Sequence, residues 1–284
     1  MSGGNTLKGA GTAVLLALFA GLAQAATISL APTLAGQYAE GKGVDGTFLK
    51  IFDGWHDSSV LWNEETGQFG SGVPVGSLPW GSGLWGLADW KTANHEPAPG
   101  MIEGALTVRV GQIAFSDERY NLEYAATWGE IPLAPLFVPG ASDPTQDNWT
   151  SSFSGYIRIA EAGIYNFGVL HDDGFYFSLG GADASLDLFN DYLNPRDRLG
   201  FADNLALTPG LYSFELGAYD RLEAGVVDLS WSVNGGAWEI VPTPYLVAEP
   251  DIRPVPEPAT VAMMVAGLLA LGGLVRRRAS CARG

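Results

Sequence analysis

Short runs of alternating apolar and polar residues dominate the middle of the chain. Residues 156–159 (Tyr-Ile-Arg-Ile) and residues 165–169 (Tyr-Asn-Phe-Gly-Val) alternate large apolar side chains with polar or small ones. This period of two predicts β-strands with one buried face. Glycine, proline and aspartate separate the runs, which is typical of strands joined by tight turns. Further strands are predicted at residues 47–52, 60–62 and 105–110.

The overall composition agrees with this pattern. The chain has 284 residues, with 38 glycines, 17 prolines and 11% aromatic residues. These frequencies favour an all-β protein with many turns. The length allows one or two domains and a sizeable core. The lone cysteine, Cys281, excludes a disulfide within the chain, so stability must come from the core and from any bound metal.

The chain is strongly acidic, with a formal net charge of −16 at pH 7. Such a surface repels phosphate backbones, so no nucleic acid is expected as a partner. The same surface attracts cations. The simplest explanation of the charge by itself is solubility in an exposed setting.

The first 25 residues predict a secretory signal peptide. Lys8 supplies a positive start, residues 13–22 are apolar, and residues 23–25 (Ala-Gln-Ala) form a small-x-small cleavage site. The apolar run is short for a retained membrane span. The mature chain is therefore expected to be exported.

The C-terminal residues 259–284 predict one transmembrane helix. A Pro-rich, extended linker at residues 249–258 leads into an uncharged, mostly apolar run at residues 259–275, and three arginines follow. This run is barely long enough to span a bilayer. The arginines are expected to stay in the cytoplasm, which places the preceding chain on the other side. A plain single-pass anchor is the simplest interpretation.

The same tail carries a motif. Its parts are a Pro-Glu-Pro triplet and an arginine cluster: Pro256, Glu257, Pro258, Arg276, Arg277 and Arg278. With the short apolar run between them, they resemble the PEP-CTERM sorting tail of Gram-negative bacteria. The resemblance implies an exosortase-type membrane enzyme as partner, transient residence in the inner membrane, and a cell-surface or extracellular destination, or a membrane anchor if the tail is retained. It also implies an association with exopolysaccharide and biofilms.

A second resemblance covers residues 101–248 and is strongest over residues 155–231. The motifs, in order, are Gly-Tyr-Ile-Arg-Ile, Glu-Ala-Gly-x-Tyr-x-Phe-Gly, Asp-Asp-Gly, Leu-Thr-x-Gly-x-Tyr and x-Leu-Ser-Trp. This order resembles the protective-antigen (PA-fourteen) domain of toxins, glycosidases and yeast flocculin-type adhesins. The resemblance implies an antiparallel β-sandwich or barrel.

The segment of residues 26–100 has a different character. It holds five of the nine tryptophans among many Gly, Ser and Pro residues, and no helical period persists in it. Tryptophan can stack on sugar rings, but it more often fills irregular β cores. The segment is predicted to be β-rich, either as a small domain or as early strands wrapped on the main sandwich.

The strongest candidate site is the acidic pair Asp172-Asp173, followed by Gly174, at a predicted strand end. Hard oxygen ligands suit Ca²⁺, and a divalent cation relieves the repulsion between adjacent carboxylates. The resemblance implies that sugar-binding relatives join such a pair by a cis peptide and hold one Ca²⁺, which accepts two sugar hydroxyls. The alternative is ordinary Asp-Asp-Gly turn chemistry.

The resemblance also suggests further residues around this turn. A neighbouring loop adds oxygens in sugar-binding relatives, and Asp191 and Asp220 are the candidates for completing a metal site with Asp172 and Asp173. His171 and Asn190 are candidates for lining the sugar pocket with the same pair. A hydrogen-bonded loop histidine is the simpler interpretation of His171.

No set of catalytic residues stands out. The three histidines lack zinc-ligand spacing, and no Gly-x-Ser-x-Gly occurs. The chain is therefore expected not to be an enzyme. The sequence predicts an exported, lectin-like protein that binds extracellular polysaccharide or another glycan through Ca²⁺. The alternative is a structural surface or biofilm-matrix protein with no specific ligand.

Overall fold

The computed structural model of the protein describes residues 27–79, 81–117, 134–135, 147–191, 198–200, 204–222 and 224–255. The predicted signal peptide, the Pro-Glu-Pro motif and the predicted transmembrane helix with its arginines lie outside these ranges. Within them, every helix is too short or too polar to cross a bilayer.

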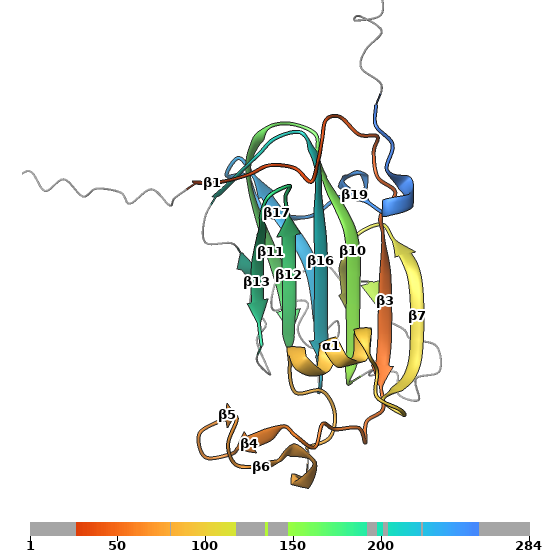
Figure 1. Cartoon of the computed structure of the whole chain (residues 1–284), viewed down its shortest axis with the longest axis vertical. Helices are drawn as coiled ribbons and strands as arrows, with labels where there is room; N and C mark the ends of the chain where they lie inside the picture. Colours follow the sequence, from red (N-terminus) through yellow and green to blue (C-terminus); the bar gives the residue numbers. More distant parts are fainter. Residues whose placement is uncertain are drawn as a thin grey trace, which may run out of the picture.

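Two open sheets of eight strands form the body of the protein (Figure 1). The first, called the β11 sheet, has the order β1 (Thr27–Leu30), β15 (Asn204–Leu207), β11 (Gly163–Asp172), β17 (Val226–Val233), β8 (Ala114–Ser116) and β9 (Ala134–Pro135), with β14 (Arg198–Gly200) beside β11 and β18 (Glu239–Ile240) beside β17. The second, called the β16 sheet, has the order β13 (Ser185–Asn190), β12 (Gly174–Gly180), β16 (Gly210–Asp220), β10 (Trp149–Ile159), β3 (Val44–Ile51) and β7 (Ile102–Val110), with β19 (Leu246–Val247) beside β10 and β2 (Leu34–Ala35) beside β16. Neighbouring strands are antiparallel except in the pairs β1–β15 and β8–β9.

The main core lies between these two sheets. In β16, Phe214, Leu216 and Ala218 are buried in it at every second position, as the period of two predicts. The β11 sheet contributes residues such as Phe167 and Leu229 to the same cluster. Two layers that share one apolar core form a β-sandwich. The sheets do not close into a barrel.

The segment between β3 and β7, residues 52–100, lies at one end of the sandwich and is called the cap. It contains a third, small sheet and two helices: β4 (Leu61–Asn63), β5 (Gln68–Phe69), β6 (Val73–Pro74), the 3₁₀ helix η1 (Val75–Ser77) and α1 (Leu87–His95). In Figure 1, α1 crosses the ends of β12, β16 and β10.

A second apolar cluster fastens α1 to the outer face of the β16 sheet. Trp90 of the helix packs with Leu49, Ile51 and Tyr219, which point away from the main core. Its indole nitrogen donates to the Ser151 carbonyl oxygen at 2.8 Å. The sequence did not predict this helix because it has only nine residues and its stability comes from this packing rather than from a long amphipathic pattern.

The sheets do not divide at residue 100, where the sequence placed a boundary. Strand β3 pairs with both β10 and β7, and β1 pairs with β15. The early strands are therefore part of the sandwich, and only the cap is separate from its two sheets. Of the segment 26–100, the described residues up to 51 thus contribute strands to the sandwich, and the cap follows them.

The start of the expected linker also packs on the body. Residues 249–251 form a 3₁₀ helix, η3 (Glu249–Asp251), after η2 (Thr243–Tyr245). The Val255 amide then donates to the Gln37 carbonyl oxygen at 2.9 Å. In Figure 1, β1 and this last described segment both lie at the end of the sandwich opposite α1.

Candidate functional site

The acidic pair lies where the chain passes from one sheet to the other. Asp172 is the last residue of β11, and Gly174 is the first residue of β12 in the opposite sheet. Only Asp173 lies between them, and the Asp172–Asp173 peptide bond is cis, as the resemblance implies. The pair therefore sits at the end of the sandwich, where loops from both sheets meet.

Backbone contacts hold this turn in place. The Asp173 amide donates to the Tyr219 carbonyl oxygen at 2.9 Å, and Asp173 Oδ2 accepts from the Arg221 amide at 2.8 Å. His171 Nδ1 donates to the Asp173 carbonyl oxygen at 2.9 Å. The histidine is fully buried, and its ring lies 4.4 Å from that of Phe175. It thus supports the turn from inside the sandwich and does not face a surface pocket.

Asp220 is the most unusual residue of this region. It ends β16, opposite Trp149 of β10, and is completely buried. Neither of its carboxylate oxygens has a hydrogen-bond partner among the residues that the structure describes. Burial raises its pKa well above the usual range, and the charges of Asp173, Asp117, Asp172 and Asp147, in that order of effect, raise it further. A buried carboxylate among four others is unfavourable unless a cation or a proton balances it.

Two of these neighbours, Asp117 and Asp147, were not among the residues that the sequence singled out. Asp117 follows β8 and fixes the loop after β16: its carboxylate accepts from the Gly225 amide, and its own amide donates to the Gly225 carbonyl oxygen. Asp147 precedes β10 in a turn-rich segment. The available signal was weak, because each is only an aspartate next to a strand.

The donor set has the chemistry that Ca²⁺ requires. Carboxylates from the 172–173 turn and from the end of β16 supply hard oxygens, and backbone carbonyls and water commonly complete such a site. Among the described residues, no three His, Cys, Asp or Glu side chains already stand in ligand geometry. A site here would thus combine side-chain carboxylates with oxygens of other kinds.

Asn190 and Asp191 lie at the end of β13, the strand that pairs with β12. Asn190 ends β13 and pairs with Phe175, and its side-chain oxygen is buried without a hydrogen-bond partner. Asp191 Oδ1 accepts from the Leu87 amide at the start of α1, at 2.7 Å, and Asp191 is also hydrogen-bonded to the Tyr219 hydroxyl. Asp191 thus binds the N-terminus of the helix through one of its oxygens, and its role as a metal ligand stays a prediction.

Arg221 connects the acidic turn to the cap. Its side chain is buried, its Nη2 donates to the Ser82 carbonyl oxygen at 2.9 Å, and its guanidinium lies 4.3 Å from the ring centre of Trp85. Burial lowers its pKa, while Asp173 and Asp220 act in the opposite direction. A polar cavity of about 240 Å³ opens beside it, and Asp147 and Asn148 line that cavity.

The tryptophans of the cap divide between core and surface roles. Trp85 and Trp90 are almost completely buried, at 1% exposure each. Trp90 belongs to the second apolar cluster, whereas Trp85 packs with the rings of Trp62 and Phe69 and with Arg221. Trp55 and Trp62 are half-buried.

No curated protein matches the chain. Among solved structures, a PA14 sugar-binding domain from an RTX adhesin is 16% identical, covers 75% of this chain and 99% of its own, and has a TM-score of 0.43. The epithelial adhesin 6 A domain of Candida glabrata, solved with Galβ1-3GlcNAc, is 12% identical, covers 81% and 99%, and has a TM-score of 0.47.

Two anti-sigma factor domain-containing proteins also match. The first is 14% identical with a TM-score of 0.40 over 76% of this chain, and the chain spans about half the length of both. The family comparison is more local. A model of the PA14 domain matches residues 139–185, a stretch that runs from before β10 to the start of β13 and includes the cis Asp172–Asp173 turn.

Proposed function

We propose that the protein is an exported, non-enzymatic carbohydrate-binding protein that holds extracellular polysaccharide through Ca²⁺ at the acidic turn. The observation that carries this proposal is Asp220. It is a completely buried carboxylate with no hydrogen-bond partner in the described part of the chain, and it feels the charges of four further aspartates. A divalent cation would balance this concentration of negative charge. The PA14 match over the same turn supports a sugar as the ligand.

The residues divide into distinct roles. Asp172, Asp173 and Asp220 would hold the ion, which supplies open coordination positions for two sugar hydroxyls. Asp117 keeps the loop after β16 in place through Gly225, and His171 and the Arg221 amide keep Asp173 in place. Asn190, at the end of β13 beside β12, lies where it would help to line the sugar pocket.

The termini fit display at a surface. The last described residues leave the sandwich at the end opposite the acidic turn and the cap (Figure 1). In our proposal, the signal peptide directs the chain through the inner membrane, an exosortase-type enzyme recognises the PEP-CTERM-like tail, and the acidic end faces the surrounding polysaccharide.

The first test is thermal unfolding of the full-length protein with excess Ca²⁺ and with chelator. An ion at a hundredfold excess over its Kd adds about 2.7 kcal/mol of stability, which corresponds to a rise in Tm of roughly 5–10 °C for a protein of this size. Asp173→Asn should abolish the rise. Asp183→Asn makes the same charge change on the exposed β12–β13 turn at the far end and should keep it.

The second test is a glycan array with the wild-type protein, with Ca²⁺ and with chelator. Reproducible hits that need Ca²⁺ and that disappear in Asp173→Asn support the proposal. A Tm that does not respond to Ca²⁺ would refute the metal site. A Ca²⁺-dependent Tm without any Ca²⁺-dependent hit would instead favour a structural matrix protein with a stabilising ion.

A further inference from the structure

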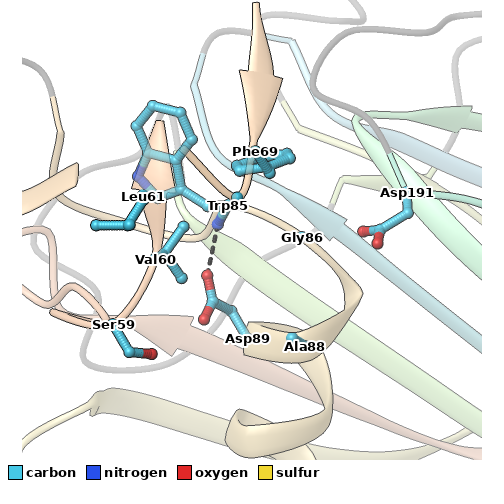
Figure 2. Close-up of a pocket in the computed structure, with 10 residues that line it drawn as sticks. Ser59, Val60, Leu61, Phe69, Trp85, Gly86, Ala88, Asp89 and Asp191 are labelled. Carbon is cyan, nitrogen blue, oxygen red and sulfur yellow. Dashed lines mark hydrogen bonds between the residues drawn. The ribbon is translucent and has the colours of Figure 1, made fainter. Parts of the chain in front are cut away.

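A second cavity lies within the cap, separate from the ion site proposed above. It has a volume of about 380 Å³ and is lined by residues from the small sheet, from the start of α1 and from the end of β13 (Figure 2). Pockets for small organic ligands commonly begin at about 300 Å³. The space is therefore large enough for a sugar unit.

One wall of this cavity is aromatic. Phe69 of β5 is 41% exposed, and its ring packs edge-on against Trp62 at 4.9 Å and against Trp85 at 5.9 Å. Leu61 of β4 extends the same apolar surface. A flat aromatic surface of this kind suits the C–H face of a saturated ring and the π-attraction of a cation.

The other walls are acidic. Asp89 and Asp191 line the cavity, and neither lysine nor arginine occurs among the residues described there. Asp89 is 2% exposed, and its Oδ2 accepts from the Trp85 amide at 2.7 Å. Figure 2 shows its second oxygen turned away from that bond, toward Ser59.

A simpler interpretation is that both carboxylates only cap α1. Each does accept a backbone amide near the helix N-terminus, which favours negative charge there. However, burial raises the pKa of Asp89 to about 6. The hydrogen bond from the Trp85 amide lowers this pKa, and the charges of Asp57 and Asp191 raise it. The hydrogen bond at the helix start therefore stabilises the negative charge of Asp89 only in part, and a cation in the cavity would stabilise it further.

We propose that this cavity binds a protonated amino sugar, that is, a hexosamine unit with a free ammonium group within a polysaccharide. The ammonium pairs with Asp89, and the ring lies against the exposed Phe69. That the cation is carried by a sugar rests on the function proposed above. The cavity itself needs no Ca²⁺, so the two sites can fail separately.

The test is calorimetric titration of the full-length protein with the β-1,4-linked tetramer of glucosamine, in the presence of a chelator. The titration is run at about pH 6.5, where Asp89 is largely ionised. The N-acetylated tetramer has the same rings without the charge and should bind at least tenfold more weakly. Asp89→Asn keeps an acceptor for the Trp85 amide and should also weaken binding at least tenfold.

Two further variants complete the design. Phe69→Ala removes an exposed ring outside the main core and should lower the affinity severalfold, which keeps the proposal testable if Asp89→Asn folds poorly. Glu64→Gln removes an exposed charge from the same small sheet, outside the cavity lining, and should change nothing. Equal losses in Asp89→Asn and Glu64→Gln would mean general attraction to an acidic protein and would overturn the proposal.

The remaining outcomes separate the two sites. Binding of the glucosamine tetramer in chelator, with no Ca²⁺-dependent glycan binding, would support this cavity and refute sugar binding through Ca²⁺ at the acidic turn. Equal binding of both tetramers would overturn the role of the ammonium. If a lysine-rich peptide bound as tightly as the glucosamine tetramer, and Asp89→Asn abolished that binding, the assignment of a sugar as the ligand would be overturned.

Discussion

The acidic turn and the cavity of the cap lie at the same end of the molecule, but they are built in different ways. The turn is made by strands in fixed register, and backbone hydrogen bonds set its geometry from both sheets. The cap cavity is made by short elements, namely the small sheet at the end of the sandwich and the start of α1, which packs on the outer face of the β16 sheet. A buried carboxylate occurs in each, Asp220 in one and Asp89 in the other.

The two buried carboxylates differ in their hydrogen bonds. Asp220 accepts no hydrogen bond, whereas Asp89 accepts one from the Trp85 amide at a helix start. The first carboxylate is thus suited to direct coordination of a metal ion, and the second to a softer, hydrogen-bonding cation. Three variants test this difference between the two regions.

The largest effect is expected from Trp90→Ala. This side chain is 1% exposed, and it lies over Gly217, where the helix approaches β16 so closely that a Cβ would lie 2.1 Å from the indole ring. Loss of a buried tryptophan costs about 3–5 kcal/mol. Urea unfolding should show this decrease in stability, and calorimetry should show that the glucosamine tetramer no longer binds. The stability gained from Ca²⁺ should persist. A Ca²⁺ response lost together with the helix would mean that the two regions act as one site.

The next effect is expected from Asp89→Asn as a function of pH. The folded-state pKa of Asp89 is raised from 3.8 to about 6, so the fold favours the protonated form. The stability that this group contributes is fully present below about pH 4 and is lost as the pH rises through 6. The variant lacks this titration, so its stability relative to wild type should increase by at most about 3 kcal/mol between pH 4 and pH 7.5. Chemical unfolding of both proteins across this range is the measurement, and a constant difference would contradict the prediction.

The smallest effect on stability, but the clearest in sign, is expected from Asp220→Asn. In chelator, removal of a buried charge near four carboxylates should raise stability by about 1 kcal/mol or more, because the amide carries no charge to desolvate. In excess Ca²⁺ the variant should gain less than wild type, since one anionic ligand is missing. Thermal melts in both conditions test this, with Asp183→Asn as the control. A variant that is less stable in chelator would show that Asp220 is structural.

The two regions also differ in how much of each could be predicted from the sequence. The strands of the sandwich and the 172–173 turn were predictable, because a period of two and an Asp-Asp-Gly turn are local signals. Asp220, at the end of β16, was a candidate only through the resemblance to a known family. Asp117 and Asp147 were not candidates, since their proximity to Asp220 depends on how β8 pairs with β17 and how β10 pairs with β16. Helix α1 and the cap cavity gave no local signal at all.

Side-chain alternation and turn chemistry act over a few residues, so a β-rich chain with an acidic turn follows from the sequence alone. The fold in space was needed to show which carboxylates lie close enough to influence Asp220, that Asp191 binds the start of α1, and that the early strands complete the sandwich. The physical reason is that electrostatic interaction and packing depend on distance in space. Strand register brings together segments that lie tens of residues apart along the chain.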